Sequence, residues 1–141
     1  MLVLDTHVVS ELRKVRSGTA DASVAQWSDS VDVADLFVSA ITIRELEIGV
    51  LLAERQDPSK GAVLRAWLHS HVLPAFSGRV LPVDIAVAQR SLKLHVRAVR
   101  SLRDSFIAAT ALVHGMTVVT RNVAAFAASR VNIVNPWTWE A

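Results

Sequence analysis

Three acidic residues, Asp5, Glu45 and Asp104, are set in apolar surroundings where an unpaired carboxylate is costly. Asp5 directly follows an apolar run, and Asp104 opens a largely apolar segment. Hard divalent cations such as Mg²⁺ prefer carboxylate and water oxygens, often together with a substrate phosphate. A cation held here could bind a phosphodiester, lower the pKa of a bound water and stabilise the leaving oxygen. Convergence of the three carboxylates would therefore favour metal-dependent phosphodiester hydrolysis.

Glu45 is distinguished by a helical pattern. Four residues recur at helical spacing and are expected to face the core as one stripe: Ile41, Glu45, Ile48 and Leu52. This stripe is apolar except at Glu45. The other charged residues of this segment are expected on the solvent side: Arg44, Glu47 and Glu54. A buried salt bridge to an arginine is the alternative explanation for a carboxylate on that stripe.

The two aspartates also have a simpler interpretation. Asp5 and Asp104 each stand where a helix is expected to begin, and an acidic residue there can cap the helix or favour its dipole. Asp84 follows another expected strand and is interpreted in the same way, as a cap. The sequence permits the convergence of Asp5, Glu45 and Asp104 but does not by itself establish it.

The elements that must position these residues alternate between strands and helices. Strands are expected at 1–4, 36–38, 79–83, 116–120 and 131–134. Helices are expected at 6–13, 21–30, 41–55, 59–76, 84–96 and 103–114, with a basic, irregular stretch at 95–102. This alternation predicts one domain, 1–141, with helices on both faces of a parallel sheet. At the carboxyl edge of such a sheet, Asp5 would meet Arg121 and Asn122.

Composition narrows the function classes. The 141 residues are 52% hydrophobic and include no cysteine, which excludes a disulfide scaffold, a cysteine-ligated zinc site and a thiol nucleophile. No secretory signal or membrane-spanning run is visible, so a soluble, cytoplasmic protein is expected. The net charge is only +2, but arginine far outnumbers lysine. The arginines expected to contact phosphate groups, unless they simply form a solvated surface, are Arg97, Arg100, Arg103 and Arg121.

Five segments, in order, resemble the motifs of PIN-domain toxins of the VapC type, and especially the FitB-like branch. They cover nearly the whole chain: Leu2–Leu12 with its Asp5-Thr6-His7, Ser39–Val50, Arg103–Ala111, Thr117–Asn122 and Asn135–Trp137. The resemblance implies a PIN-like three-layer α/β/α fold around a central, mostly parallel sheet of about four to five strands.

The resemblance also implies a function. It implies the toxin of a type II toxin–antitoxin system, a Mg²⁺- or Mn²⁺-dependent endoribonuclease that cleaves transfer or ribosomal RNA. Asp5, Glu45 and Asp104 would hold the metal, Asn122 would complete the catalytic set, and Thr6 and Thr120 would support it. The implied partners are an RNA substrate, a VapB-type antitoxin, a second copy of the chain, and operator DNA reached only through the antitoxin.

The chain departs from the family's pattern at two places. His7 stands where the family commonly has Asn, and the additional acid of the fourth motif is replaced by Asn122 and Ala125 at its two usual positions. One tightly bound metal ion is therefore expected instead of two. The missing acid also keeps open a binding module without catalysis, acting within an antitoxin and operator complex. A third reading is a Mg²⁺-dependent hydrolase of small phosphoesters on a similar sheet.

Overall fold

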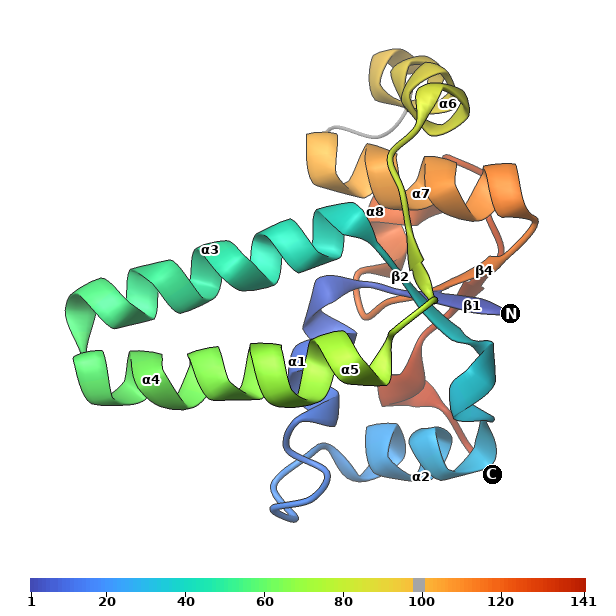
Figure 1. Cartoon of the computed structure of the whole chain (residues 1–141). Coiled ribbons are helices and arrows are strands. Elements are labelled where there is room, and N and C mark those ends of the chain that lie inside the picture. Colours follow the sequence, from blue (N-terminus) through green and yellow to red (C-terminus); the bar gives the residue numbers. More distant parts are fainter. Residues whose placement is uncertain (98–100) are drawn as a thin grey trace.

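The structure is a computed structural model that describes the backbone of residues 1–97 and 101–141, and the side chains of 1–94 and 101–141. Five parallel strands form its sheet, in the order β3-β2-β1-β4-β5 (Figure 1). They are β1 (Leu2–Leu4), β2 (Leu36–Ser39), β3 (Val80–Leu81), β4 (Thr117–Val119) and β5 (Ile133–Val134). The sheet order changes direction at β1, which places the loops after β1 and β4 next to each other at the carboxyl edge, where Asp5 lies.

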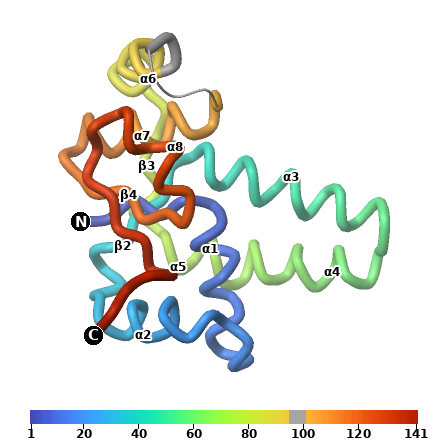
Figure 2. Tube along the Cα trace, turned by 180° about the vertical axis from the view of Figure 1, so that it is seen from behind, coloured from blue at the N-terminus to red at the C-terminus, as the bar shows by residue number. Residues whose placement is uncertain are grey.

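Helices cover both faces of the sheet. Those of the described chain are α1 (Thr6–Leu12), α2 (Ala22–Ser30), α3 (Ala40–Gln56), α4 (Pro58–Trp67), α5 (Leu73–Ala75), α6 (Ile85–Arg97), α7 (Leu102–His114) and α8 (Val123–Ala127). Three short turns complete the order: η1 (Val33–Asp35), the π-helical turn η2 (Leu68–Val72), and η3 (Pro136–Thr138). The trace from behind shows both chain ends at the side opposite the tip of α3 and α4 (Figure 2). This arrangement confirms the predicted α/β/α fold.

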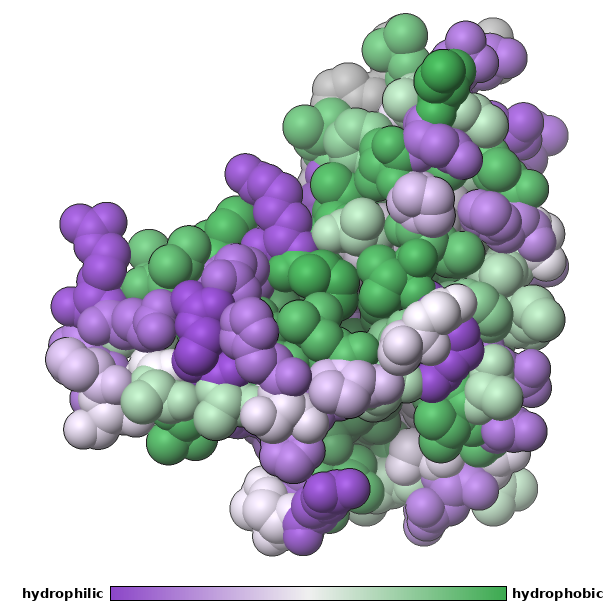
Figure 3. Space-filling view, in the orientation of Figure 1, coloured by the Kyte–Doolittle hydropathy of each residue, from purple (hydrophilic) through white to green (hydrophobic). Residues whose placement is uncertain are grey.

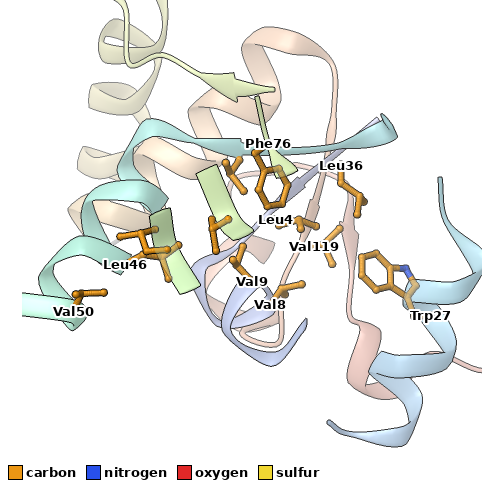
Figure 4. Packing of buried hydrophobic residues seen from close by; sticks show 12 residues of the cluster. Leu4, Val8, Val9, Trp27, Leu36, Leu46, Val50, Phe76 and Val119 are labelled. Atoms are coloured by element: carbon orange, nitrogen blue, oxygen red, sulfur yellow. The ribbon is translucent and has the colours of Figure 1, made fainter. Parts of the chain in front are cut away.

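The core consists of two clusters, one on each face of the sheet. Successive side chains of a strand point to opposite faces, so Val3 joins one cluster and Leu4 the other. The cluster around Leu4 packs the sheet against α1, α2, α3 and η2, and includes Trp27 and Phe76 (Figure 4). The cluster around Val3 packs it against α7 and α8. Because both faces are buried, the central strands are continuously apolar, as the sequence predicted.

Helices α3 and α4 form a hairpin that projects away from the sheet (Figure 1). Its helices approach so closely at Gly61 that a Cβ atom there would lie 2.4 Å from Glu54 Cα. Arg65 of α4 pairs with Glu47 and, at 2.8 Å, with Glu54 of α3. Hydrophilic side chains accordingly gather over this hairpin, while hydrophobic surface lies in the centre of the same view (Figure 3). The ion pairs of Arg65 therefore hold α3 and α4 together in the part of the hairpin that lies away from the hydrophobic core.

The structure corrects several predicted boundaries. The predicted strand 79–83 pairs only over Val80–Leu81, and helix α8 was not predicted. The predicted helix 59–76 is three consecutive segments, because the turn that precedes Pro74 is a π-helix, and proline offers no N–H to continue the α-helical pattern. Helix α6 reaches Arg97 and so extends into the stretch expected to be irregular, of which 98–100 lie outside the described residues.

Candidate active site

Asp5 lies at the centre of a hydrogen-bonded chain at the carboxyl edge of the sheet. Pairing of β1 with β4 places it beside Thr120, whose Oγ1 donates to Asp5 Oδ2 over 2.8 Å. Asp5 Oδ1 accepts from the backbone N of Thr6 over 2.7 Å, so Asp5 also caps α1. Asn122 contributes its backbone N–H, which donates to Thr120 Oγ1 at 3.0 Å. Only 1% of Asp5 is exposed, and its two oxygens are therefore fixed in direction.

Asp104 is the second buried carboxylate of this edge. It lies in the first turn of α7 but does not cap it, because Ser101 is the N-cap and accepts from the Asp104 backbone N. Burial, as the largest effect, raises the pKa of Asp104 above its ordinary value, and the charge of Asp5 raises it further. Arg103, whose Nε lies 3.3 Å from Asp104 Oδ1, and His7 lower it. The charge of Asp5 therefore acts on Asp104, which makes these two aspartates the candidate pair at this edge.

Glu45 occupies a different position from the one its pattern predicted. The buried residues of α3 are Thr42, Leu46 and Val50, whereas Leu52, expected on the same stripe as Glu45, is 52% exposed. The prediction that the stripe with Glu45 and Leu52 faces the core is therefore wrong. The helix is rotated about its axis so that the neighbouring stripe, which begins at Thr42, packs against the core. The Glu45 side chain is 28% exposed and lies 3.7 Å from the exposed Arg44, so it forms no buried salt bridge.

The residues of this edge fit a divalent cation in part. Over the residues that the structure describes, no three Asp, Glu, His or Cys side chains converge as metal ligands. Mg²⁺ is commonly held by only one or two carboxylates, with waters and substrate phosphates as the remaining ligands. Asp5 and Asp104 supply such a pair, and Glu45 does not join it in this arrangement.

Two buried hydroxyls near these helix starts have no hydrogen-bond partner: Thr6 Oγ1 and Thr42 Oγ1. Thr6 follows Asp5, and Thr42 precedes Glu45 by one helical turn. Buried polar groups are nearly always satisfied, so water or a ligand is the natural partner for such atoms. Thr42 was not among the residues predicted from the sequence. A polar residue on the stripe that also carries Leu46 and Val50 was the available signal.

The predicted phosphate-binding arginines differ in their surroundings. The exposed Arg121, directly after β4, stacks over Trp137 with 5.2 Å from Cζ to the ring centroid. Arg103 is paired with Asp104. Arg97 has no described side chain, and Arg100 lies outside the described residues. Asp84 accepts from the backbone N of Val87 over 3.0 Å, which confirms that it caps α6.

The fold and the site define an α/β protein with buried, paired aspartates at the carboxyl edge of a parallel sheet. Residues 2–130 match the family described as PIN domain. The chain is 39% identical to the VapC ribonuclease Y4jK of Sinorhizobium fredii over 97% of this chain and 98% of that one. It is 38% identical to the toxin FitB of Neisseria gonorrhoeae, over 97% and 99%.

The structural comparison agrees with these relatives. The crystal structure of FitAcB from Neisseria gonorrhoeae superposes with a TM-score of 0.88 at 36% identity and covers 99% of this chain and 100% of that one. A FitAB structure bound to an IR36 DNA fragment superposes with a TM-score of 0.86 at 37% identity, covering 100% and 99%. The chain belongs to the PIN-domain family, in its VapC-type, FitB-like branch.

No helix in the described part of the chain is both long and apolar enough to cross a membrane.

Proposed function

We propose that this protein is the toxin of a toxin–antitoxin system and acts as a divalent-metal-dependent endoribonuclease. The observation that carries the proposal is the pair of buried aspartates on a PIN fold, Asp5 and Asp104, of which Asp104 has its pKa raised by burial and by the charge of Asp5. Its relatives named as a VapC ribonuclease and a toxin support the same activity. Because transfer and ribosomal RNA work in the cytoplasm, the proposal places the enzyme there.

In this proposal Asp5 and Asp104 hold Mg²⁺ or Mn²⁺, which supplies Lewis-acid stabilisation of the phosphate charge when bound. Thr120 fixes the direction of Asp5 through the 2.8 Å hydrogen bond. Glu45, half-buried at the start of α3, accepts a proton from the attacking water or orients it. Arg121, held by Trp137, binds a phosphate of the RNA strand.

Cleavage of structured RNA by the purified protein tests this function. Wild-type protein with Mg²⁺ or Mn²⁺ should cut at discrete sites, and EDTA should abolish the cuts. Asp5→Asn and Asp104→Asn should each lose more than about 100-fold in rate, because outer residues around a metal alone contribute about 10- to 100-fold. The matched control is Asp29→Asn, which removes an exposed carboxylate of α2 and should cleave normally. Full activity in both site variants would refute the assignment.

The partners follow from the same relatives. FitAB is a solved complex that also binds DNA. We propose that this chain pairs with a VapB-type antitoxin, forms a homodimer, and reaches operator DNA only through that antitoxin. Co-purification with the product of an adjoining short gene, followed by light scattering of the complex, tests these assignments.

The second candidate is a PIN-fold module without catalysis. Asn122 contributes only its backbone N–H to the described hydrogen-bonded chain, and position 125 is Ala, so the fourth acid is missing. This candidate predicts metal binding without RNA cleavage. A small-phosphoester hydrolase would instead cleave p-nitrophenyl phosphate esters and leave RNA intact.

A further inference from the structure

Two adjoining hollows lie at the end of α1 that is remote from Asp5. Their volumes are about 380 Å³ and about 650 Å³, and both are lined by Arg13, Trp67 and His71. They therefore adjoin each other on the surface between the C-terminal end of α1 and the helical segment α4–η2. We call the two hollows together the Trp67 hollow.

The Trp67 hollow is cationic. Arg16 lines one part and Lys14 the other, and neither part is lined by Asp or Glu. Lys14 is partly neutralised by Glu11 at 3.5 Å. Arg13 and Arg16 form no ion pair within the part of the chain that the structure describes. Their charges are therefore available to an anionic ligand.

Arg13 is held in place by an aromatic ring instead of a carboxylate. Its Cζ lies 5.6 Å from the centroid of the Trp67 ring. Such stacking orients the guanidinium while leaving its N–H groups free to bind a phosphate. Arg65, which lies on α4 like Trp67, differs from Arg13 because its N–H groups bind the carboxylates of Glu47 and Glu54. Arg13 therefore differs from a structural arginine.

The backbone beside the hollow is irregular in a way that proteins often use for binding. The segment η2 is a π-helical turn, and the backbone N of Leu73 donates to the Leu68 carbonyl. Such turns are rare and occur frequently at functional sites. The exposed His71 lies within this turn and lines both parts of the hollow.

We propose that the Trp67 hollow binds the RNA strand at a distance from the cut site. This inference rests on the proposed ribonuclease function and extends it. Phosphates bind Arg13 and Arg16, and a base stacks on the exposed ring of His71, which lines both parts of the hollow beside Trp67. Helix α1 connects the two places: Asp5 is its N-cap and Arg13 its C-cap. Eight residues at about 1.5 Å each separate them by about 12 Å, which a short run of nucleotides spans.

Charge alone would also attract an acidic peptide. RNA is favoured because the hollow places a guanidinium and an indole ring face to face beside a second free arginine, which matches alternating bases and phosphates. The hollow lies at the opposite end of α1 from Asp5, so in this proposal one bound strand contacts both places.

The test is RNA binding in EDTA, where cleavage does not interfere. The probe is a fluorescein-labelled, 12-nucleotide single-stranded RNA, and anisotropy is measured from low to moderate salt. The Arg13→Ala/Arg16→Ala variant is compared with Arg55→Ala/Arg90→Ala, which removes two exposed arginines outside the hollow and gives the same net charge. Circular dichroism checks that both variants fold. A poly-glutamate peptide is titrated in parallel.

The expected result is specific to the hollow. Removing Arg13 and Arg16 should weaken RNA binding by at least about tenfold. It should also reduce the slope of log affinity against log salt by about 1.4, since each phosphate contact on a single strand contributes about 0.7. The control variant should change neither quantity.

Three results would overturn the inference. They are unchanged RNA binding in Arg13→Ala/Arg16→Ala, an equal loss in the control variant, or a loss that affects poly-glutamate but not RNA. A failure of the ribonuclease function itself is read separately, as absence of Mg²⁺-dependent cleavage by the wild-type protein, and it would remove the basis of the inference even if RNA bound.

Discussion

At the scale of single residues, the site combines rigidity with an electrostatic cost. Asp5 is fixed by two hydrogen bonds, and the pKa of the buried Asp104 is raised above its ordinary value. Burial and the charge of Asp5 disfavour the ionised form of Asp104 unless a cation is present. The metal-free protein therefore contains a local destabilising interaction that a divalent ion relieves.

Thr120 is expected to act on metal binding through Asp5. Thr120→Val removes one hydroxyl that donates to Asp5 Oδ2 and accepts from the Asn122 backbone N–H. The Thr120 side chain is fully buried. We expect the free energy of unfolding to fall by about 1–3 kcal/mol and Mn²⁺ affinity to fall about 10- to 100-fold. Urea unfolding and Mn²⁺ titration measure these. Thr120→Ser retains the hydroxyl and should behave nearly as wild type; an equal loss in Thr120→Ser would show that packing, not the hydrogen bond, matters.

Asp104 should make the stability of the metal-free protein depend on pH. Its pKa is higher in the folded than in the unfolded protein, so the folded protein holds the proton more tightly. The free energy of unfolding therefore falls as pH rises from the ordinary value near 3.8 through the raised folded value. Asp104→Asn should remove this fall, so that in EDTA the variant is the more stable at pH 7 but not at pH 4. A wild type as stable as the variant at pH 7 would contradict the raised pKa.

At the scale of elements, the α3–α4 hairpin depends on close approach at one position. The Cβ that Gly61 lacks would lie 2.4 Å from Glu54 Cα, and backbone atoms must shift to admit it. Away from this contact, Asp57 caps α4 and Arg65 joins the two helices. The hairpin carries Thr42 and Glu45 at its base and Trp67 at its end, so its position relative to the sheet affects both the candidate active site and the Trp67 hollow.

Gly61→Ala and Gly49→Ala should have opposite effects. At Gly61 the added methyl group overpacks the hairpin, and we expect a loss of about 1–3 kcal/mol in the free energy of unfolding. At Gly49, in the middle of α3, nothing lies within 4 Å of the added Cβ. That substitution should stabilise the protein by about 0.5–1 kcal/mol, because alanine is the better helix former. Thermal unfolding measures both, and a stable Gly61→Ala variant would contradict the close approach.

At the scale of the whole molecule, the layers on the two faces of the parallel sheet both contribute residues to its carboxyl edge. The β1–β4 pairing brings residues 5 and 120 together, and α7 adds Asp104 from the opposite layer. A cation bound there joins segments that are far apart in the sequence. It should therefore stabilise the entire fold and not only one loop.

Mg²⁺ or Mn²⁺ should raise the melting temperature of the protein. At a concentration 100 times the dissociation constant the gain is about 2.7 kcal/mol, which corresponds to roughly 5–10 °C for a domain of this size. The shift should be larger at pH 8 than at pH 5, because Asp104 must lose its proton to bind the ion. Asp5→Asn should show no shift and Asp29→Asn the full one. A shift of equal size in Asp5→Asn would place the bound ion elsewhere.

The sequence by itself determined the alternation of elements, the parallel sheet and the position of Asp5 at the carboxyl edge. These follow from local rules: continuous apolar runs mark strands buried on both faces, and the residues directly after them reach the carboxyl edge. Helix boundaries were predicted best where a cap was present, as at Asp84, or where Gly115, with a φ of 66°, ends α7. Helix α8 was missed because it is only five residues long.

Only the tertiary structure decided which face of α3 is buried. Two stripes of that helix were possible, and packing on the core selected Thr42, Leu46 and Val50, which left Glu45 half-buried beside Arg44. The structure likewise decided that Arg13 and Arg121 stack on Trp67 and Trp137 while Arg65 is neutralised. The physical reason is that burial and charge pairing depend on neighbours distant in sequence, and the spacing of residues along one segment carries no information about those neighbours.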